Sequence, residues 1–204
     1  MQTVKNIIFD LGGVFIQIDY SKTLKAFTDL QVQDFNTFYT QHHASDLFEA
    51  LETGKLEAEE FYNKFRNHTN TTLRDEQIED SWNALLGTFY PDRLEWLDEI
   101  RHKYKVYLFS NTNAIHHKAF MKIYQEQTGK NNFDDYFIKA YYSHEMGLRK
   151  PYVEAYDFVL KEQGLEAPET LFIDDTLTNI EGARKAGLQT VHLLPSISLT
   201  ELGL

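Results

Sequence analysis

The N-terminal segment joins an apolar run to a carboxylate and two glycines: Ile7-Ile8-Phe9-Asp10-Leu11-Gly12-Gly13-Val14. A short run of β-branched and aromatic residues is typical of a strand that is buried on both faces of a parallel sheet. Asp10 ends this run, and the glycines after it allow other groups to approach the backbone closely. The segment therefore predicts a buried strand that places a carboxylate at its C-terminal end.

Further apolar runs of this kind follow at residues 106–109, 171–173 and 190–194, with a weaker one at 140–143. Helical patterns separate the runs; Pro91 begins one helix, and another runs from Pro151 to Gly164. This alternation predicts an α/β fold with a Rossmann-like, doubly wound parallel sheet as its core. Such sheets bind ligands at the carboxyl ends of their strands, so polar residues there are candidates for one site.

Residues 17–89 interrupt the alternation of strands and helices. Their apolar residues recur at helical spacing, and no run among them looks like a strand. We therefore expect an inserted all-helical cap. The predicted division is a catalytic core of residues 1–16 and 90–204 and a helical cap subdomain of residues 17–89.

Composition narrows the possible classes of protein. The 204 residues are 42% hydrophobic and 25% charged, as in an ordinary globular chain, and the formal net charge of −11 disfavours nucleic acid and anionic membranes as partners. Cys is absent, so neither a disulfide nor a thiol nucleophile is possible. No apolar stretch approaches the roughly 20 residues of a membrane span. We expect a cytoplasmic protein with a small-molecule ligand; the pattern carries no signal for an oligomeric state.

Carboxylates follow two of the predicted strands. Asp10 ends the first, and Asp174 and Asp175 follow the run at 171–173. At neighbouring strand ends these groups would repel one another unless a hard cation such as Mg²⁺ lay between them. Asp10 is also the simplest nucleophile for a phosphoryl group, because an ordinary carboxyl is ionised at neutral pH without a base.

Groups suited to binding an anion follow two other elements. Ser110 and Asn111 offer a hydroxyl and amide groups before a helix, and Lys150 adds a positive charge beside Pro151. The sequence has no Gly-x-x-x-x-Gly-Lys-[Ser/Thr] motif, which excludes a P-loop nucleotide-binding enzyme. With the carboxylates and Mg²⁺, these groups are the parts needed to bind and neutralise a phosphoryl group.

Four segments in order resemble the motifs of the haloacid dehalogenase-like (HAD) hydrolase superfamily. They are residues 7–14, Leu108-Phe109-Ser110-Asn111-Thr112, Gly147-Leu148-Arg149-Lys150-Pro151, and Phe172-Ile173-Asp174-Asp175 with Asn179. The resemblance covers the whole chain, because residues 17–89 lie where that family inserts its helical cap.

The resemblance implies a role for each site residue. Asp10 would be the nucleophile that forms an aspartyl-phosphate. Mg²⁺ would be held by Asp10, the Gly12 carbonyl and the last motif, with Asp175 as a direct ligand and Asp174 as an indirect one. The resemblance further implies that two neighbouring groups, the Ser110 hydroxyl and the Asn111 amide, hold the phosphoryl oxygens. It implies that Lys150 bridges the nucleophile and the phosphate.

Gly12 departs from the family pattern, since HAD phosphatases usually carry there a second Asp that protonates the leaving group. The form Asp-Leu-Gly-x-Val resembles α-D-glucose-1-phosphate phosphatases of the superfamily. We therefore expect a Mg²⁺-dependent phosphatase of a small phosphorylated metabolite, with a sugar phosphate such as glucose 1-phosphate as the example. The missing acid is dispensable for a good leaving group, or a residue of the cap subdomain or water replaces it. Asp19 is the candidate residue, although the first role that we expect for it is the N-cap of a helix at the hinge of the cap subdomain.

Two other functions remain open from the sequence. A 2-haloacid dehalogenase would use Asp10 without a metal. Such an enzyme would have no cation for the carboxylates of Asp174 and Asp175 to bind. A non-catalytic protein that binds phosphorylated ligands or a partner is suggested by Gly12 alone. The adjacent pairs His42-His43 and His116-His117 point to different faces of a helix, so we expect solvated side chains and not a metal site.

Overall fold

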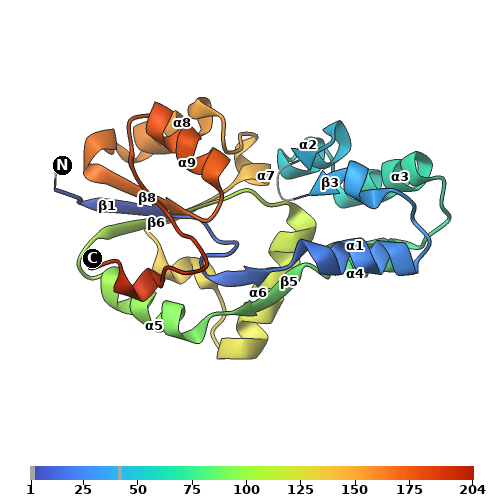
Figure 1. The fold of residues 1–204 in the computed structure, drawn as a ribbon, viewed down its shortest axis with the longest axis horizontal. Helices are drawn as coiled ribbons and strands as arrows, with labels where there is room; N and C mark the ends of the chain where they lie inside the picture. The colour runs from blue at the N-terminus through green and yellow to red at the C-terminus, as the bar shows by residue number, and fades with distance from the viewer. Residues whose placement is uncertain (1–2, 41–42) are drawn as a thin grey trace.

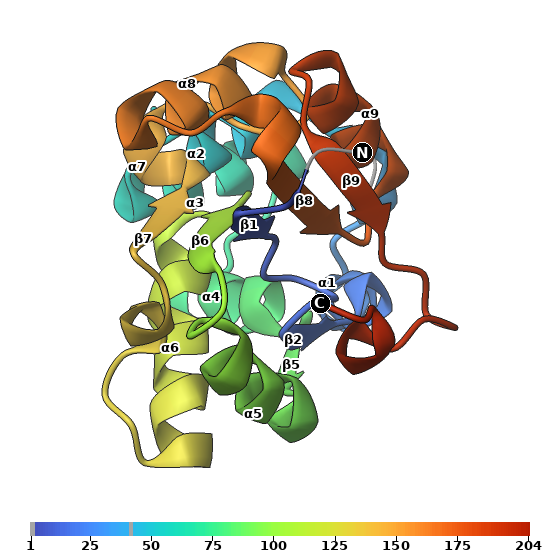
Figure 2. The same ribbon diagram turned by 90° about the vertical axis from the view of Figure 1, so that its left-hand side faces the viewer.

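The computed structural model describes residues 3–40 and 43–204, and its centre is a five-stranded parallel sheet (Figure 1). Figure 2 shows the strand order β7-β6-β1-β8-β9, in which every neighbouring pair is parallel. The strands are β1 (Asn6–Phe9), β6 (Lys105–Ser110), β7 (Lys139–Tyr142), β8 (Thr170–Asp174) and β9 (Gln189–His192). The predicted α/β fold with a doubly wound sheet is therefore confirmed.

Helices cover both faces of this sheet. On one face lie α5 (Pro91–Ile100) and α6 (Ala114–Thr128), and on the other α8 (Val153–Gln163) and α9 (Leu177–Lys185) (Figure 1). Strand β1 shows why its sequence is apolar throughout: Ile7 and Phe9 pack in the first hydrophobic layer and Ile8 in the second. A strand buried on both faces has no polar side of its own.

Short elements complete the core around these helices. They are α7 (Ser143–Met146) and the 3₁₀ turns η2 (Phe133–Tyr136), η3 (Ala167–Glu169) and η4 (Leu199–Glu201). The expected helix ends are present: Pro91 begins α5, and Gly164, in the left-handed conformation, follows α8. Within the part of the chain that the structure describes, no helix has the length and apolar character needed to cross a membrane.

Four helices of residues 17–89 lie together at the right of Figure 1. Their apolar side chains form a hydrophobic cluster to which Ile115 of α6 also contributes. The four helices are α1 (Tyr20–Asp29), α2 (Asp46–Glu52), α3 (Ala58–Thr69) and α4 (Asp75–Asn83), with the 3₁₀ turn η1 (Phe35–Thr37). Trp82 lies fully buried in this cluster, against the rings of Phe48 and Phe61. A separate cluster is what an inserted subdomain needs in order to be stable beside the sheet.

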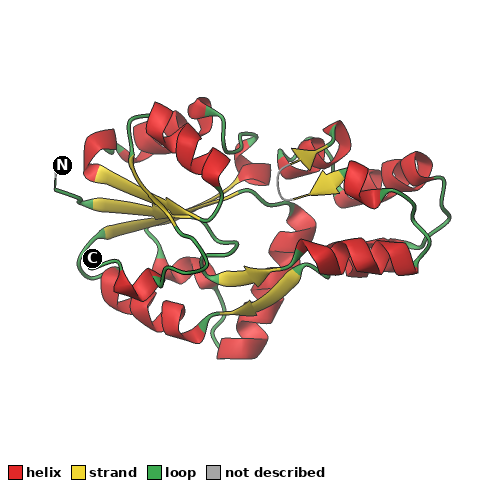
Figure 3. Cartoon of the chain, in the orientation of Figure 1, coloured by secondary structure: helices red, strands yellow, loops and turns green. Residues whose placement is uncertain are grey.

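The expectation that residues 17–89 contain no strand is wrong. Strands β2 (Ile16–Ile18) and β5 (Leu86–Phe89) form an antiparallel ribbon between the sheet and the helices (Figure 3), and β3 (Tyr39–Thr40) pairs with β4 (His43–Ala44). Helical spacing continues past Trp82, but α4 ends at Asn83 because the chain there pairs with a segment far away in sequence. The predicted boundary at 16/17 falls within β2, and the one at 89/90 coincides with the end of β5. The division itself stays a prediction.

His116 is buried, contrary to the expectation of a solvated side chain, while His42 lies outside the described residues. The His116 ring stacks on Trp82, its Nε2 lies 3.1 Å from the Trp82 carbonyl oxygen, and its Nδ1 lies 3.1 Å from Asn113 Nδ2. This network suits the neutral ring, with Nε2 as donor and Nδ1 as acceptor. Burial lowers the pKa of His116 to about 4.

We expect the buried His116 to make the protein less stable in mild acid. Below the ordinary pKa of about 6.5, the unfolded chain binds a proton that the folded protein excludes, so stability is lost as pH falls from about 6.5 towards about 4. Between pH 7 and pH 5 the loss should be about 2 kcal/mol. Urea unfolding at both pH values should show this difference reduced in His116→Gln but unchanged in His102→Gln, at an exposed position. An unchanged difference in His116→Gln would contradict the argument.

Candidate active site

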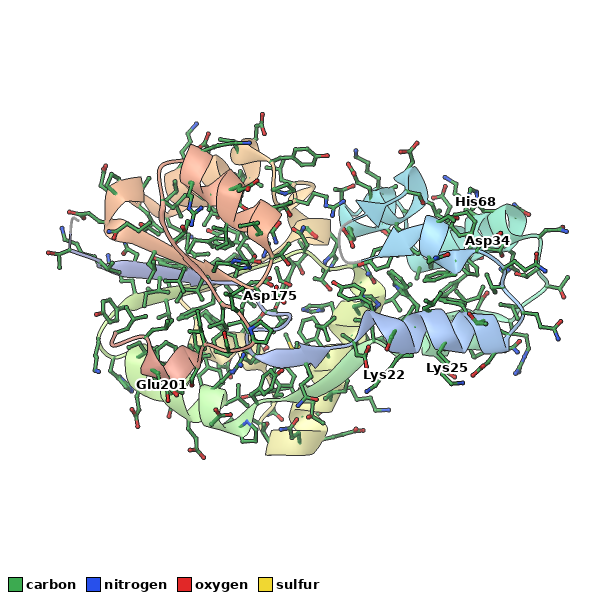
Figure 4. The ribbon with its side chains drawn as sticks, viewed as in Figure 1. Lys22, Lys25, Asp34, His68, Asp175 and Glu201 are labelled. Atoms are coloured by element: carbon green, nitrogen blue, oxygen red, sulfur yellow. The ribbon has the colours of Figure 1, made fainter. Side chains whose placement is uncertain are left out.

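A cavity of about 580 Å³ lies at the carboxyl ends of β1 and β6, and its size suits a small metabolite. Figure 4 labels Asp175 at the end of the sheet that faces α1. The sequence-predicted residues Asp10, Gly12, Ser110, Asn111, Lys150 and Asp175 all line this cavity. Parallel strands bring them together, because their carboxyl ends meet at one edge of the sheet.

Three carboxylates and one ammonium group form the centre of the site. Asp10, Asp174 and Asp175 each offer an oxygen within 4.8 Å of the others. The Lys150 Nζ, almost fully buried, donates to Asp10 Oδ1 at 2.7 Å, to Asp174 Oδ2 at 2.8 Å and to the Phe109 carbonyl at 2.8 Å. All three of its donors are used, so Lys150 holds Asp10 in place and supplies positive charge beside it.

The electrostatics of this cluster leave negative charge uncompensated. Burial raises the pKa of the Asp10 carboxyl to about 7 although Lys150 opposes the shift. Burial and the charge of Asp174 likewise raise the pKa of Asp175. Burial alone would lower the pKa of Lys150, but Asp10 and Asp174 outweigh it and raise that pKa. The cluster fits a divalent cation, because clustered carboxylate oxygens are the ligands that Mg²⁺ prefers.

The two acids of the last motif differ in their surroundings. Asp174, fully buried, accepts hydrogen bonds from the Thr176 N–H, the Asn179 side chain and Lys150. Asp175 accepts one side-chain hydrogen bond, from the Thr176 hydroxyl, and lines the cavity. Its carboxylate lies against Gly13, where an added Cβ would be 2.2 Å from Asp175 Oδ2. Asp175 is therefore the acid with room for a direct contact to Mg²⁺.

We expect Asp175→Asn to weaken Mg²⁺ binding more than Asp174→Asn does. Loss of a direct ligand should raise the Mg²⁺ concentration for half-maximal effect by more than about 100-fold, and loss of a supporting group by about 10-fold. Mg²⁺-dependent thermal stabilisation of each folded variant measures both values without a turnover assay. The reverse order would make Asp174 the direct ligand.

Ser110 and Asn111 play different parts in the geometry. Ser110, buried at the end of β6, presents its hydroxyl among the cavity residues. The Asn111 side chain donates to the Lys150 carbonyl and accepts from the Lys150 N–H, both at 2.9 Å. Its side-chain amide therefore clamps the Lys150 backbone with its oxygen and one of its two N–H groups.

The position that carries the second Asp in the family pattern lies close to a side chain of this protein. A Cβ at Gly12 would lie 3.1 Å from Ile18 Cγ1 on strand β2. Asp19, the expected substitute acid, is exposed and is absent from the residues that line the cavity. Its carboxylate caps α1 by accepting from the Ser21 N–H at 3.0 Å. The expectation that Asp19 supplies the proton therefore loses its support.

Residues near the cap add a polar wall that the sequence motifs did not indicate. Arg149 lies 3.3 Å from Glu49 and 3.1 Å from Glu52, and the Tyr39 hydroxyl donates to Glu52 at 3.0 Å. All four line the cavity, as does Tyr20 at the start of α1. Glu52 lies one helical turn after Phe48 on the buried face of α2. A charged residue on an otherwise apolar helix face is the feature of the sequence from which its place in the site could have been predicted.

A family model for haloacid dehalogenase-like hydrolases matches residues 4–187, which includes every element of the site. The chain belongs to this family. The HAD resemblance seen in the four motifs is thereby confirmed, and the protein is a hydrolase. The predicted fold and the order of the motifs agree with this assignment.

Known members of the HAD family match this hydrolase over nearly its whole length. The D-ribitol-5-phosphate phosphatase of Bacteroides thetaiotaomicron is 34% identical over 187 residues, which cover 92% of this chain and 90% of that protein. The sesquiterpene phosphatase astK of Aspergillus oryzae is 29% identical and covers 96% of this chain and 93% of that protein. A solved HAD enzyme of Bacteroides thetaiotaomicron, in complex with magnesium and inorganic phosphate, has a TM-score of 0.84 at 32% identity, covering 98% of each chain.

Proposed function

We propose that this HAD hydrolase is a Mg²⁺-dependent phosphatase of a small phosphorylated metabolite. The observation that carries the proposal is the cluster of Asp10, Asp174, Asp175 and Lys150 at the floor of the cavity. The enzyme is a phosphoric monoester hydrolase, and Mg²⁺ is its cofactor. Its cytoplasmic location and its lack of a nucleic-acid partner stay predictions from the sequence.

The proposed reaction uses Asp10 as the nucleophile. A carboxylate oxygen of Asp10 attacks phosphorus, and the bond between phosphorus and the leaving-group oxygen breaks. The leaving oxygen keeps the electron pair and takes a proton. Water then attacks the aspartyl-phosphate and releases inorganic phosphate. Mg²⁺, when bound by Asp10, Asp175 and the Gly12 carbonyl, supplies positive charge that offsets the charge of the phosphoryl oxygens.

We infer that Lys150 and Ser110 prepare the site for this attack. Lys150 fixes one oxygen of Asp10 at 2.7 Å, which holds the other oxygen in a defined direction. Ser110 lines the same cavity, which supports the proposal that its hydroxyl binds a phosphoryl oxygen. Asn111 positions Lys150, because its side chain holds the backbone of that residue.

The leaving group of the substrate is proposed to be a sugar or a sugar alcohol. The 34% identical relative is named for D-ribitol 5-phosphate, whereas the Aspergillus relative is named for a sesquiterpene phosphate. The wall formed by Glu49, Glu52 and Arg149 favours the hydroxylated alternative, because charged side chains bind hydroxyls and disfavour a hydrocarbon. Glucose 1-phosphate belongs to the same class of candidates.

The two rival functions have less support than phosphate transfer. A metal-independent dehalogenase would not need three carboxylates that each have an oxygen within 4.8 Å of the others. A non-catalytic binding protein gives no reason for Lys150 to use one of its three donors on Asp10.

A screen for phosphate release tests the proposal. The panel contains ribitol 5-phosphate, glucose 1-phosphate, glucose 6-phosphate and p-nitrophenyl phosphate, each with Mg²⁺ and with EDTA, and a 2-haloacid with halide detection. We expect phosphate release that depends on Mg²⁺ and no halide release. Halide release in EDTA would support the dehalogenase, and binding without any turnover would support the non-catalytic protein.

A further inference from the structure

The proposed phosphatase lacks the usual proton donor for its leaving group. A primary alcohol leaves phosphorus as a strongly basic alkoxide, and a general acid that protonates it accelerates the reaction by about 10²–10⁴. Gly12 has no acid, and Ile18 occupies the space next to it. Asp19 is exposed and serves as the cap of α1. If the proposed function holds and the substrate is the phosphate of a primary alcohol, the proton has to come from water or from another residue of the cavity.

Several donors that line the cavity are already engaged by the protein. Lys150 uses all three of its protons, and His116 is neutral with both ring nitrogens in contact with protein groups. The Tyr39 hydroxyl donates to Glu52. Burial raises the pKa of Glu52, and Arg149 and the Tyr39 hydroxyl oppose this shift. Both oxygens of Glu52 face these two partners, at 3.1 Å from Arg149 and 3.0 Å from the Tyr39 hydroxyl.

The hydroxyls of Ser110, Thr112 and Thr178 also line the cavity but are poor acids. An alcohol is no more acidic than the alcohol that leaves, whereas a phenol has an ordinary pKa of about 10. Two tyrosines of the cavity remain, Tyr20 and Tyr152. Tyr152 is 53% exposed, so solvent surrounds much of its side chain.

Tyr20 has the surroundings that a proton donor needs. It begins α1, directly after the cap residue Asp19, and its ring lies 6.1 Å from that of Tyr39. Within residues 3–40 and 43–204, no hydrogen-bond partner is found for its hydroxyl, which is therefore free for a ligand. Burial, then the charges of Glu52, Asp175 and Asp10, raise the pKa of Tyr20. The phenol is therefore protonated at neutral pH, and it gives up its proton less readily than an ordinary phenol, only to a strong base such as an alkoxide.

We propose that the Tyr20 hydroxyl is the catalytic proton donor to the leaving group, in place of the acid that Gly12 lacks. As the bond from phosphorus to the leaving oxygen breaks, that oxygen takes the Tyr20 proton and departs as an alcohol. In the second step water attacks the aspartyl-phosphate and passes one proton to the Tyr20 phenolate. The residue thus returns to its starting state, and one water is consumed for each phosphate released.

The test compares Tyr20→Phe with the native enzyme on two leaving groups. Ribitol 5-phosphate releases a primary alcohol, which needs a proton, whereas p-nitrophenyl phosphate releases a stable phenolate, which does not. We expect Tyr20→Phe to lower kcat/KM for ribitol 5-phosphate by about 10²–10⁴ and for p-nitrophenyl phosphate by less than about threefold. Across aryl and alkyl phosphates of graded leaving-group pKa, the dependence of kcat/KM should be shallow in the native enzyme and steep in the variant.

Tyr62→Phe is the matched control, because Tyr62 lies in the same group of helices and its hydroxyl contacts Glu79 outside the cavity. It should alter neither substrate. Equal losses on both substrates in Tyr20→Phe would overturn the proposal and give Tyr20 a positioning role. A selective loss in Tyr152→Phe instead would move the donor to that residue. If the native protein releases no phosphate even from p-nitrophenyl phosphate, the proposed function itself fails.

Discussion

Asp10→Asn is expected to abolish phosphate release while the protein stays folded. The amide has nearly the shape of the carboxylate and can still accept the Lys150 hydrogen bond, which is 2.7 Å long in the native protein. It cannot attack phosphorus, so the rate should fall on the order of 10⁵-fold or more, as expected for loss of a nucleophile. Steady-state phosphate release, with circular dichroism to verify folding, measures this effect.

An exposed acid provides the control for Asp10→Asn. Asp157→Asn on α8 removes the same charge from an exposed residue that does not line the cavity. The rate of phosphate release by this variant should equal that of the native enzyme. A folded Asp10→Asn variant with a rate within tenfold of the native one would exclude Asp10 as the nucleophile. The aspartyl-phosphate route, and with it the proposed roles of Lys150 and Mg²⁺, would then be lost.

Lys150→Met is expected to have the largest effect on stability. It removes the ammonium group that Asp10 and Asp174 share, and it leaves buried carboxylates without that partner. Breaking a buried ion pair in this way costs about 3–5 kcal/mol of the free energy of unfolding. Activity should fall as well, because Asp10 is no longer held in one direction.

The pH dependence of Lys150→Met follows from the same charges. Without the lysine, nothing opposes the effect of burial on Asp10, so the pKa of that carboxyl rises further and the folded variant binds a proton that the unfolded chain releases. Its destabilisation should therefore be greatest at pH 8 and smaller at pH 5, and Mg²⁺ should restore part of it. Urea unfolding at both pH values, with and without Mg²⁺, tests this.

The exposed Lys130 provides the comparison for Lys150→Met. Its ammonium donates to the Tyr136 hydroxyl, and Lys130→Met should change the free energy of unfolding by less than about 1 kcal/mol. A similar small cost for Lys150→Met would show that the buried cluster does not depend on its charge. A loss independent of pH would show that the lysine acts only through packing.

Local sequence patterns were sufficient to predict the fold and the polar residues at the ends of the strands. Residues 7–9 are apolar on both faces because helices cover both faces of β1, and the sequence shows this directly. Asp10 and Asp174 are likewise recognisable from where they stand, since the end of a parallel strand is where such folds bind ligands. These features depend on neighbours in sequence, so they could be predicted.

Contacts between segments that are distant in sequence determine the features that could not be predicted from the sequence. Strand β5 could not be told from the end of α4, because its partner β2 lies about 70 residues earlier. His116 became a buried, neutral side chain only because Trp82 packs on it.

The proposed proton donor also depends partly on local sequence and partly on tertiary structure. Gly12 indicated that an acid is missing, and the sequence pattern offered Asp19 two roles, first as the N-cap of a helix and second as the substitute acid. The tertiary structure turns Asp19 outwards as a helix cap and places the next residue, Tyr20, in the cavity with Asp10. Sequence alone determined which strand ends carry the chemistry, because that depends on local pattern. Only the folded chain decided which side chain faces them from the helices, because that depends on how α1 packs against the sheet.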